Sequence, residues 1–190
     1  MALTDYHKSQ EIQDPLLLHS SYGDIEEMPI DIFFRDEADF PELEIIALAL
    51  CDGKVLDVGA GVGAHALYLQ QQGFDVDALE ISRKACAIMQ KQKKKKVHNA
   101  DFFSLKDLQY DTLLFLMNGI GLAGSLEGFR ALLRFSKSLL SERGQLLFDS
   151  SNIAYLYEEF KIPLPEAYLG EIQYQYEYKG EKGEPFNWVY

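Results

Sequence analysis

The sequence has few cysteines, a minority of basic residues among its charges, and no long apolar run. Cys51 and Cys86 are its two cysteines, and their separation matches neither a zinc site nor a disulfide framework. We therefore expect two reduced core thiols and no metal site. No segment approaches the roughly 20 apolar residues of a membrane span, and the N-terminus lacks the basic start and apolar run of a secretory signal. These absences predict a cytoplasmic protein with no membrane contact.

Acidic residues outnumber basic ones by thirty to eighteen, which gives a net charge of -12. Such a surface repels polyanions, so the composition disfavours a nucleic-acid partner. The one basic tract, Lys91 with Lys93 to Lys96, is interpreted as a solvated helix end. With 190 residues, 47% of them hydrophobic, the chain is expected to form a single domain, 1–190, with a substantial core. The sequence leaves its oligomeric state open.

The pattern of apolar and polar residues changes at about residue 53. Before it, two helices are expected, at about Thr4 to His19 and Pro41 to Leu50, which would form an N-terminal helical cap over 1–50. Over 53–150, short apolar runs such as KVLDV, FDVDAL, TLLFLM and QLLF alternate with helical patterns. That alternation predicts an α/β fold with a doubly wound, mainly parallel sheet of at least five strands and helices on both faces.

The last forty residues, 151–190, follow a different pattern. A helix is expected near Ile153 to Phe160, and EIQYQYEYK at 171–179 then alternates strictly between apolar and polar residues. With the turn GEKGEP and the run FNWVY, this strand predicts a β-hairpin at an exposed edge. A strand inserted in a doubly wound sheet is buried on both faces, so we expect 171–178 not to pair with the QLLF strand.

The strongest motif is Asp57-Val58-Gly59-Ala60-Gly61-Val62-Gly63, between the strand KVLDV and a helical pattern. Glycines allow a tight turn and a close approach of ligand to backbone, while the following helix presents unpaired N–H groups. The spacing is G-x-G-x-G, whereas dinucleotide enzymes use G-x-G-x-x-G. A carboxylate before the turn repels a pyrophosphate but attracts an ammonium group. These features favour a nucleotide-like ligand with an amino-acid end.

This motif resembles that of the class I, Rossmann-like S-adenosylmethionine-dependent methyltransferases, whose first motif is an acid followed by G-x-G-x-G. The resemblance covers roughly Gly53 to Ser150. It implies S-adenosyl-L-methionine as cofactor. The cofactor-binding residues that it assigns in the glycine turn are Asp57, Gly59, Ala60, Gly61 and Gly63.

The resemblance also assigns residues at later strand ends. Glu80, with Ile81 beside it, would accept hydrogen bonds from the ribose hydroxyls. Asp101 would accept from the adenine amine while Phe102 frames the ring, although Asp101 could equally cap a short turn. Asn118 begins the fourth motif, beside the transferable methyl group. Its continuation as NGIG departs from the Asp/Asn-Pro-Pro-aromatic motif of the enzymes that methylate adenine or glutamine, which argues against those acceptors.

The activity implied by the resemblance is methyl transfer to a small-molecule acceptor by in-line displacement. The acceptor would enter between the N-terminal cap and the tyrosine-rich hairpin. A non-catalytic cofactor-binding protein, a protein methyltransferase and a nicotinamide oxidoreductase remain as alternatives. The family sheet normally has two further strands, which leaves open that the chain is truncated.

No residue identifies itself as a general base, so the catalytic residues are left open. His65, at the start of a predicted helix, is expected to pack or to form a hydrogen bond. Arg35 could reach the cofactor's carboxylate, but a surface ion pair with a neighbouring acid is the favoured interpretation; the candidates are Asp36, Glu37 and Asp39.

Overall fold

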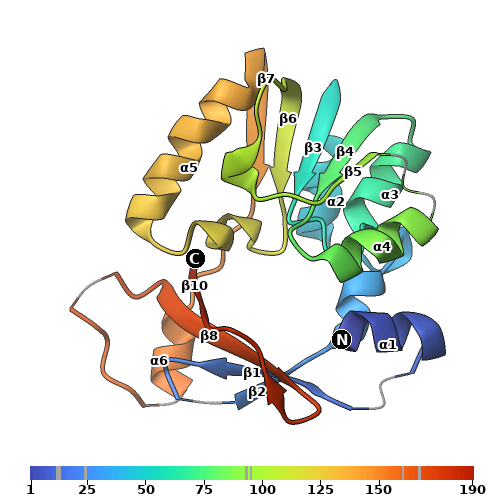
Figure 1. The fold of residues 1–190 in the computed structure, drawn as a ribbon. Helices are drawn as coiled ribbons and strands as arrows, with labels where there is room; N and C mark the ends of the chain where they lie inside the picture. The colour runs from blue at the N-terminus through green and yellow to red at the C-terminus, as the bar shows by residue number, and fades with distance from the viewer. Residues whose placement is uncertain (12–13, 24, 93, 95, 160, 167) are drawn as a thin grey trace.

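Five parallel strands form the central sheet of the structure, a computed structural model that describes every residue except 12–13, 24, 93, 95, 160 and 167 (Figure 1). The strand order is β5-β4-β3-β6-β7, and all four pairings are parallel. The bounds are β3 Lys54–Val58, β4 Asp75–Leu79, β5 Lys96–His98, β6 Tyr110–Phe115 and β7 Leu140–Phe148. The predicted five-stranded parallel sheet is confirmed.

Helices cover both faces of this sheet. Helices α2 (Glu42–Ala49), α3 (Ala64–Gln71) and α4 (Arg83–Lys91) pack on one face, and α5 (Leu126–Leu139) packs on the other. A hydrophobic core lies on each face of the sheet, and successive residues of a strand pack into opposite cores. In β3, Val55 packs into one core and Leu56 into the other, and each is 0% exposed. Burial of both faces explains why these strands are nearly continuous apolar runs.

A second, antiparallel sheet lies at the carboxyl end of the parallel one (Figure 1). Its main strands run in the order β10-β8-β1-β2, and β9 pairs with β8. The bounds are β1 Leu16–Ser20, β2 Ile25–Met28, β8 Glu171–Tyr178, β9 Glu181–Lys182 and β10 Phe186–Val189. Helix α6 (Ala154–Glu159) packs on the face that carries Ile172 and Tyr174. The predicted helix near Ile153 is confirmed over 154–159, and Phe160 lies outside the described residues.

The prediction of one helix from Thr4 to His19 is wrong. Helix α1 covers only Ala2–Ser9 and ends at Gln10, which has a left-handed conformation. Pro15 lacks a backbone N–H and disfavours helix at the residue before it, and β1 follows at once. Leu16 and Leu18 lie on the buried face of β1, so a period of two replaces the expected period of 3.6. The N-terminal cap is therefore only partly helical.

The predicted C-terminal hairpin exists, but β8 is not an edge strand. It pairs with β10 on one side and with β1 on the other, so it lies inside the antiparallel sheet. Its alternation is confirmed, since Ile172, Tyr174 and Tyr178 are buried on one face. The expectation that β8 does not pair with β7 also holds for the described residues. The alternation of apolar and polar residues identified the buried face of β8, but it could not show which strands pair with β8 on either side.

The lysine tract is only partly solvated. Lys93 and Lys95 lie outside the described residues, but the Lys94 side chain is buried, and its Nζ donates to the Val76 carbonyl. Burial lowers the pKa of Lys94. The interpretation of this tract as a solvated helix end is thus wrong for Lys94. In the described part of the chain, helices stay too short or too polar to cross a bilayer.

Candidate active site

The glycine turn connects β3 to α3 at the carboxyl end of the sheet. Gly59, Gly61 and Gly63 have φ values of 73°, 57° and 94°, which residues with a Cβ rarely adopt. A Cβ on Gly59 would meet nothing within 4 Å, whereas one on Gly63 would lie 2.8 Å from the Met89 Cγ. The first glycine therefore sets the backbone conformation and leaves open space beside it, and the last allows α4 to pack closely. Ala60 donates its N–H to the Leu79 carbonyl at 3.0 Å, which fixes the turn against β4.

Asp57, the residue before the last in β3, has a buried carboxylate that is only partly satisfied. The residue is 2% exposed, and its Oδ2 has no hydrogen-bond partner among the described residues. Burial raises the pKa of Asp57, and the nearby His65 partly opposes that shift. A buried carboxylate oxygen without a partner calls for a functional explanation. It offers a binding point for a ligand ammonium or another donor.

Glu80 follows β4, next to the glycine turn. Its Oε2 accepts from the Gly61 N–H at 2.9 Å, and its Oε1 accepts from the Ser82 N–H at 2.8 Å. Burial raises the pKa of Glu80. Ile81, the next residue, is 71% exposed at the rim. Two acids, Asp57 and Glu80, thus end adjacent parallel strands on either side of the turn, as the sequence predicted.

Asp101 and Phe102 follow β5. The Asp101 side chain accepts from the Phe103 N–H at 2.8 Å and caps the short 3-10 helix η3 (Phe102–Ser104), the alternative considered from sequence. Phe102 is 4% exposed and packs in the core, 5.2 Å from the Phe135 ring. Phe103 is instead 42% exposed. The Phe102 ring is therefore a core side chain, and the neighbouring Phe103 ring is the exposed one.

The loop after β6 carries Asn118 and contains two consecutive left-handed residues. Met117 and Asn118 have φ values of 58° and 57°, a rare conformation that neighbouring contacts must hold in place. The Asn118 N–H donates to Asp149 Oδ1 at 2.7 Å, and its side-chain oxygen accepts from Ser151 at 3.0 Å. Asp149, which was not identified from the sequence, directly follows β7 beside this loop, and burial raises its pKa. No sequence motif marks this residue.

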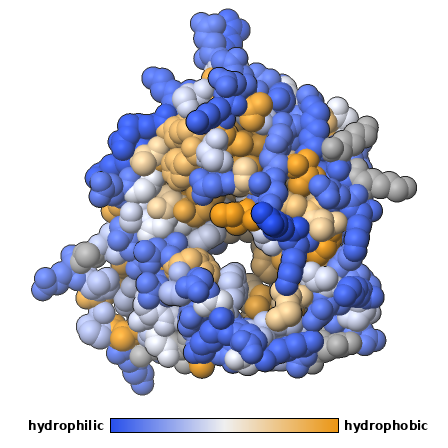
Figure 2. Space-filling model, viewed as in Figure 1, coloured by the Kyte–Doolittle hydropathy of each residue, from blue (hydrophilic) through white to orange (hydrophobic). Residues whose placement is uncertain are grey.

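The 3-10 helix η4 (Gly119–Ala123) is covered by the second sheet. A Cβ on Gly121 would overlap the indole ring of Trp188 in β10, so the ring lies directly against the glycine. Glu171 in β8 also accepts from the Leu126 N–H, at the start of α5. Figure 2 shows an opening between the α/β part and the antiparallel sheet. The second sheet therefore bounds a space at the carboxyl end of the first.

A buried ionic cluster links the N-terminal segment to α3. Arg35 Nη2 lies 2.9 Å from Glu44 Oε1, and His65 Nε2 lies 2.7 Å from Glu44 Oε2. Glu44 is 6% exposed and His65 is also 6% exposed. The expected surface ion pair of Arg35 with its acidic neighbours is wrong, because its partner is Glu44 on α2. His65 packs on Phe40 and forms a hydrogen bond, as predicted.

Glu44 was not identified from the sequence because an acid in the first turn of a helix usually faces solvent. Burial alone would raise the pKa of Glu44, but the hydrogen bonds from His65 and Arg35 hold it below its ordinary value. We expect Glu44→Ala to destabilise the fold by about 3 to 5 kcal/mol, because it leaves Arg35 buried without its partner. Urea unfolding at pH 7 measures this loss.

The control for this substitution is Glu42→Ala, at an exposed position of the same helix, which should change stability by no more than about 0.5 kcal/mol. The lowered pKa of Glu44 also determines how the stability of the protein depends on pH. The stabilisation from Glu44 is complete above the ordinary pKa of a glutamate and is lost as the pH falls through the lowered one. Equal effects of the two substitutions would show that the buried cluster contributes nothing.

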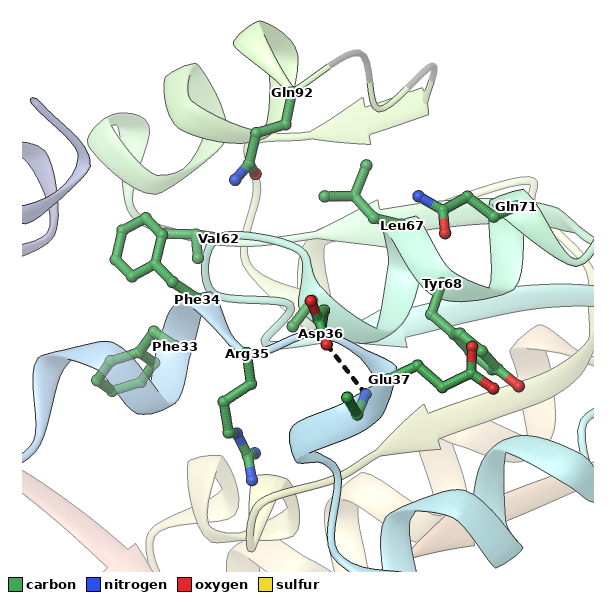
Figure 3. Close-up of a pocket in the computed structure, with 12 residues that line it drawn as sticks. Phe33, Phe34, Arg35, Asp36, Glu37, Val62, Leu67, Tyr68, Gln71 and Gln92 are labelled. Carbon is green, nitrogen blue, oxygen red and sulfur yellow. Dashed lines mark hydrogen bonds between the residues drawn. The ribbon is translucent and has the colours of Figure 1, made fainter. Parts of the chain in front are cut away.

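A cavity of about 640 Å³ lies behind the glycine turn, between α3 and the N-terminal segment. Its walls include Phe34, Val62 and Tyr68 (Figure 3). Figure 3 shows the Arg35 side chain directed away from Leu67 and Gln71 of α3. Asp57, Glu80 and Asn118 do not line this cavity. The predicted site residues therefore belong to the carboxyl edge of the sheet and not to this cavity.

A glycine turn between two strand-end acids, on a parallel sheet covered by helices on both faces, defines a cofactor-binding α/β enzyme fold. A family profile described as a methyltransferase domain matches residues 35–178. The chain is 36% identical to a solved S-adenosylmethionine-dependent methyltransferase from Bacteroides fragilis, in complex with S-adenosyl-L-homocysteine. That match has a TM-score of 0.87 and covers 100% of this chain and 78% of the other. The chain belongs to the class I S-adenosylmethionine-dependent methyltransferases, and S-adenosylmethionine is its cofactor.

Two more distant structures share the fold. A sugar N-methyltransferase from Streptoalloteichus sp. ATCC 53650 is 18% identical, with a TM-score of 0.56 over 90% of this chain and 82% of the other. An amino pentose methyltransferase from Micromonospora echinaspora is 16% identical, with a TM-score of 0.52 over 78% of this chain and 75% of the other. No curated protein sequence matches the chain.

Proposed function

We propose that this methyltransferase acts on a small-molecule acceptor bound in the opening between its two sheets. The main observation behind this proposal is that Trp188, in the antiparallel sheet, lies on Gly121 in the loop after β6. An acceptor that reaches this loop therefore enters beside the aromatic side chains of the antiparallel sheet. That space favours a small molecule over a folded protein. The net charge of -12 further disfavours nucleic acid. We also propose a cytoplasmic location, in keeping with the two reduced thiols.

The residues present fit the cofactor. Asp57 offers an unpartnered carboxylate oxygen to an ammonium group, and the turn beside Gly59 leaves room for a ligand against bare backbone. Glu80 offers a carboxylate to vicinal hydroxyls. The proposed cofactor set is the one that the family resemblance assigns: Asp57, Gly59, Ala60, Gly61, Gly63, Glu80, Ile81, Asp101, Phe102 and Asn118.

When bound, S-adenosylmethionine supplies a methyl group on a positively charged sulfur, which is already an activated leaving group. The chain's own task is then to align acceptor and methyl group and to exclude water. The loop at Asn118, which is hydrogen-bonded to Asp149, and the aromatic face of the second sheet would provide that alignment. Proton removal from the acceptor is assigned to no residue.

Calorimetric titration with S-adenosylmethionine and S-adenosylhomocysteine tests the cofactor assignment. We expect Glu80→Gln to weaken the binding of both ligands by roughly tenfold or more, because a charged acceptor for two hydroxyls is lost. The matched control is Glu142→Gln, at an exposed position on β7, which should bind both ligands like the wild type. Equal binding by all three proteins would reject Glu80 as a ribose ligand.

Transfer of a labelled methyl group into fractionated metabolites tests the acceptor class. The expected result is one or more labelled products of low molecular mass, formed by the wild type and lost in Glu80→Gln. Label found only in protein or in nucleic acid would contradict the small-molecule assignment. The same reaction with boiled enzyme provides the background.

A further inference from the structure

The face of the antiparallel sheet that carries Trp188 is mostly aromatic and aliphatic, but it holds one acid. Strand register places Glu26 on this face, because Glu26 pairs with Leu18 in β1, and Leu18 pairs with Tyr176 in β8. Every other residue that β1, β2, β8 and β10 place on this face is uncharged. A single carboxylate therefore lies on an aromatic surface.

This face is directed at the α/β part of the molecule. The Trp188 ring lies against Gly121 in the loop after β6. Phe34, in the N-terminal segment, packs with the apolar cluster that includes Tyr176 and with the one that includes Val62 of the glycine turn. The opening in Figure 2 lies between these two parts. The aromatic face therefore borders the space proposed for the acceptor.

Two rings on this face remain partly accessible. Tyr176 and Phe186 are half-buried, and they stack with ring centroids 5.3 Å apart and an interplanar angle of 29°. Stacked rings of this kind offer a flat surface to a ring or another apolar group. We call these two residues the aromatic platform.

Three tyrosines surround the Glu26 carboxylate. The Tyr22 hydroxyl donates to Glu26 Oε1, and the hydroxyls of Tyr174 and Tyr190 lie 2.9 Å from each other. Burial raises the pKa of Tyr174 and of Tyr190, and the negative charge of Glu26 acts in the same direction on both. Glu26 and these three tyrosines, the Glu26 cluster, thus combine one carboxylate with several aromatic rings.

The charge of Glu26 is not compensated by a basic residue. In the part of the chain that the structure describes, no lysine, arginine or histidine forms an ion pair with it, although Glu26 is exposed. Glu177, on the opposite face of the same sheet, does have such a partner, since His19 Nε2 lies 2.8 Å from its carboxylate. An exposed carboxylate among tyrosine rings attracts a cation, both through its charge and through the faces of the rings.

We propose that the Glu26 cluster binds an ammonium group of the acceptor while the acceptor's apolar body lies on the aromatic platform. This inference rests on the proposed function and narrows its substrate class to amines that are protonated at neutral pH. Three strand spacings, or about 14 Å, separate β2 from β10, whose Trp188 contacts the loop after β6. The ammonium group is therefore a recognition group, remote from the atom that receives the methyl group.

Two probes that differ in charge alone test this assignment. Phenylbutylammonium carries the charge, and phenylbutanol has the same phenylalkyl body without it. In calorimetry on the full chain saturated with S-adenosylhomocysteine, the wild type should bind the ammonium about tenfold more tightly than the alcohol. Glu26→Gln should reduce this ratio to about one by weakening the ammonium probe alone. Phe186→Leu should weaken both probes and keep the ratio.

The matched control is Glu27→Gln, which removes the same charge from the next residue of β2, exposed on the opposite face, and should keep the wild-type ratio. Equal binding of the two probes by the wild type would overturn the proposal and leave the proposed function standing. A ratio that falls equally in Glu26→Gln and Glu27→Gln would also overturn it, because net charge alone would then explain the preference. Binding of neither probe to a chain that binds S-adenosylhomocysteine would instead reject the proposed acceptor space itself.

Discussion

Replacing Gly121 with alanine is expected to destabilise the protein by about 3 kcal/mol and to separate Trp188, in the antiparallel sheet, from the 3-10 helix η4. The new methyl group would occupy the position of the Trp188 indole, against which the glycine lies. Overpacking of this kind costs about 1 to 3 kcal/mol, and the Phe186 ring, 6.0 Å from the indole between centroids, packs on the same side chain. Urea unfolding followed by the fluorescence of Trp188, the one tryptophan in the chain, measures both effects.

Two further variants test whether the loss of stability comes from the contact between Gly121 and Trp188. Gly119→Ala changes the same loop, but its Cβ would lie 3.4 Å from the Phe115 Cβ, an ordinary contact, so we expect a loss below about 1 kcal/mol. Adding Trp188→Ala to Gly121→Ala removes the ring that the methyl group meets, so the two substitutions should cost less together than their sum. Additive losses would mean that the ring does not lie on the glycine.

Replacing Asp57 with asparagine is expected to weaken S-adenosylhomocysteine binding by roughly 10- to 100-fold while raising the melting temperature. The loss follows from removing the charge that faces the ligand ammonium. The gain follows from burial, because Asp57 is 2% exposed and its Oδ2 has no partner among the described residues. Relieving that cost should stabilise the fold by about 1 kcal/mol, or about 3 °C for a chain of this size.

The gain in stability of Asp57→Asn over the wild type should increase with pH. Burial raises the pKa of Asp57, so the folded state holds its proton more tightly than the unfolded state does. Wild-type stability should therefore fall more steeply than that of Asp57→Asn as the pH rises from the ordinary aspartate pKa through the raised one, because the raised pKa values of Glu80 and Asp149 act equally on both proteins. The advantage of the variant thus appears at neutral pH and disappears in acid. A variant less stable than the wild type at pH 7 would show that the ionised carboxylate is well satisfied in the folded protein.

The parallel sheet and its acidic strand ends could be predicted because local sequence determines them. The runs KVLDV and TLLFLM are buried on both faces, so their apolar continuity is visible without knowledge of their neighbours. The glycines of the turn are likewise required by the backbone at those positions. Because β3 and β4 are adjacent and parallel, Asp57 and Glu80 lie at the same edge of the sheet.

Contacts between segments distant in the chain could not be predicted in this way. The pairing of β1 with β8 joins residues more than 150 positions apart, and the apolar run LLLHS was equally compatible with a helix. Glu44 is buried only because Arg35 and His65 come from two other elements. The requirement for glycine at position 121 comes from Trp188, which no local pattern links to it. These contacts also shape the space proposed for the acceptor.

A crystal structure of the chain with S-adenosylhomocysteine would test the central claim most directly. We expect the ribose at Glu80 and the ammonium group at Asp57, over the carboxyl ends of β3 and β4. A ligand bound instead in the cavity beside Tyr68, with Asp57 Oδ2 still unpartnered, would contradict it.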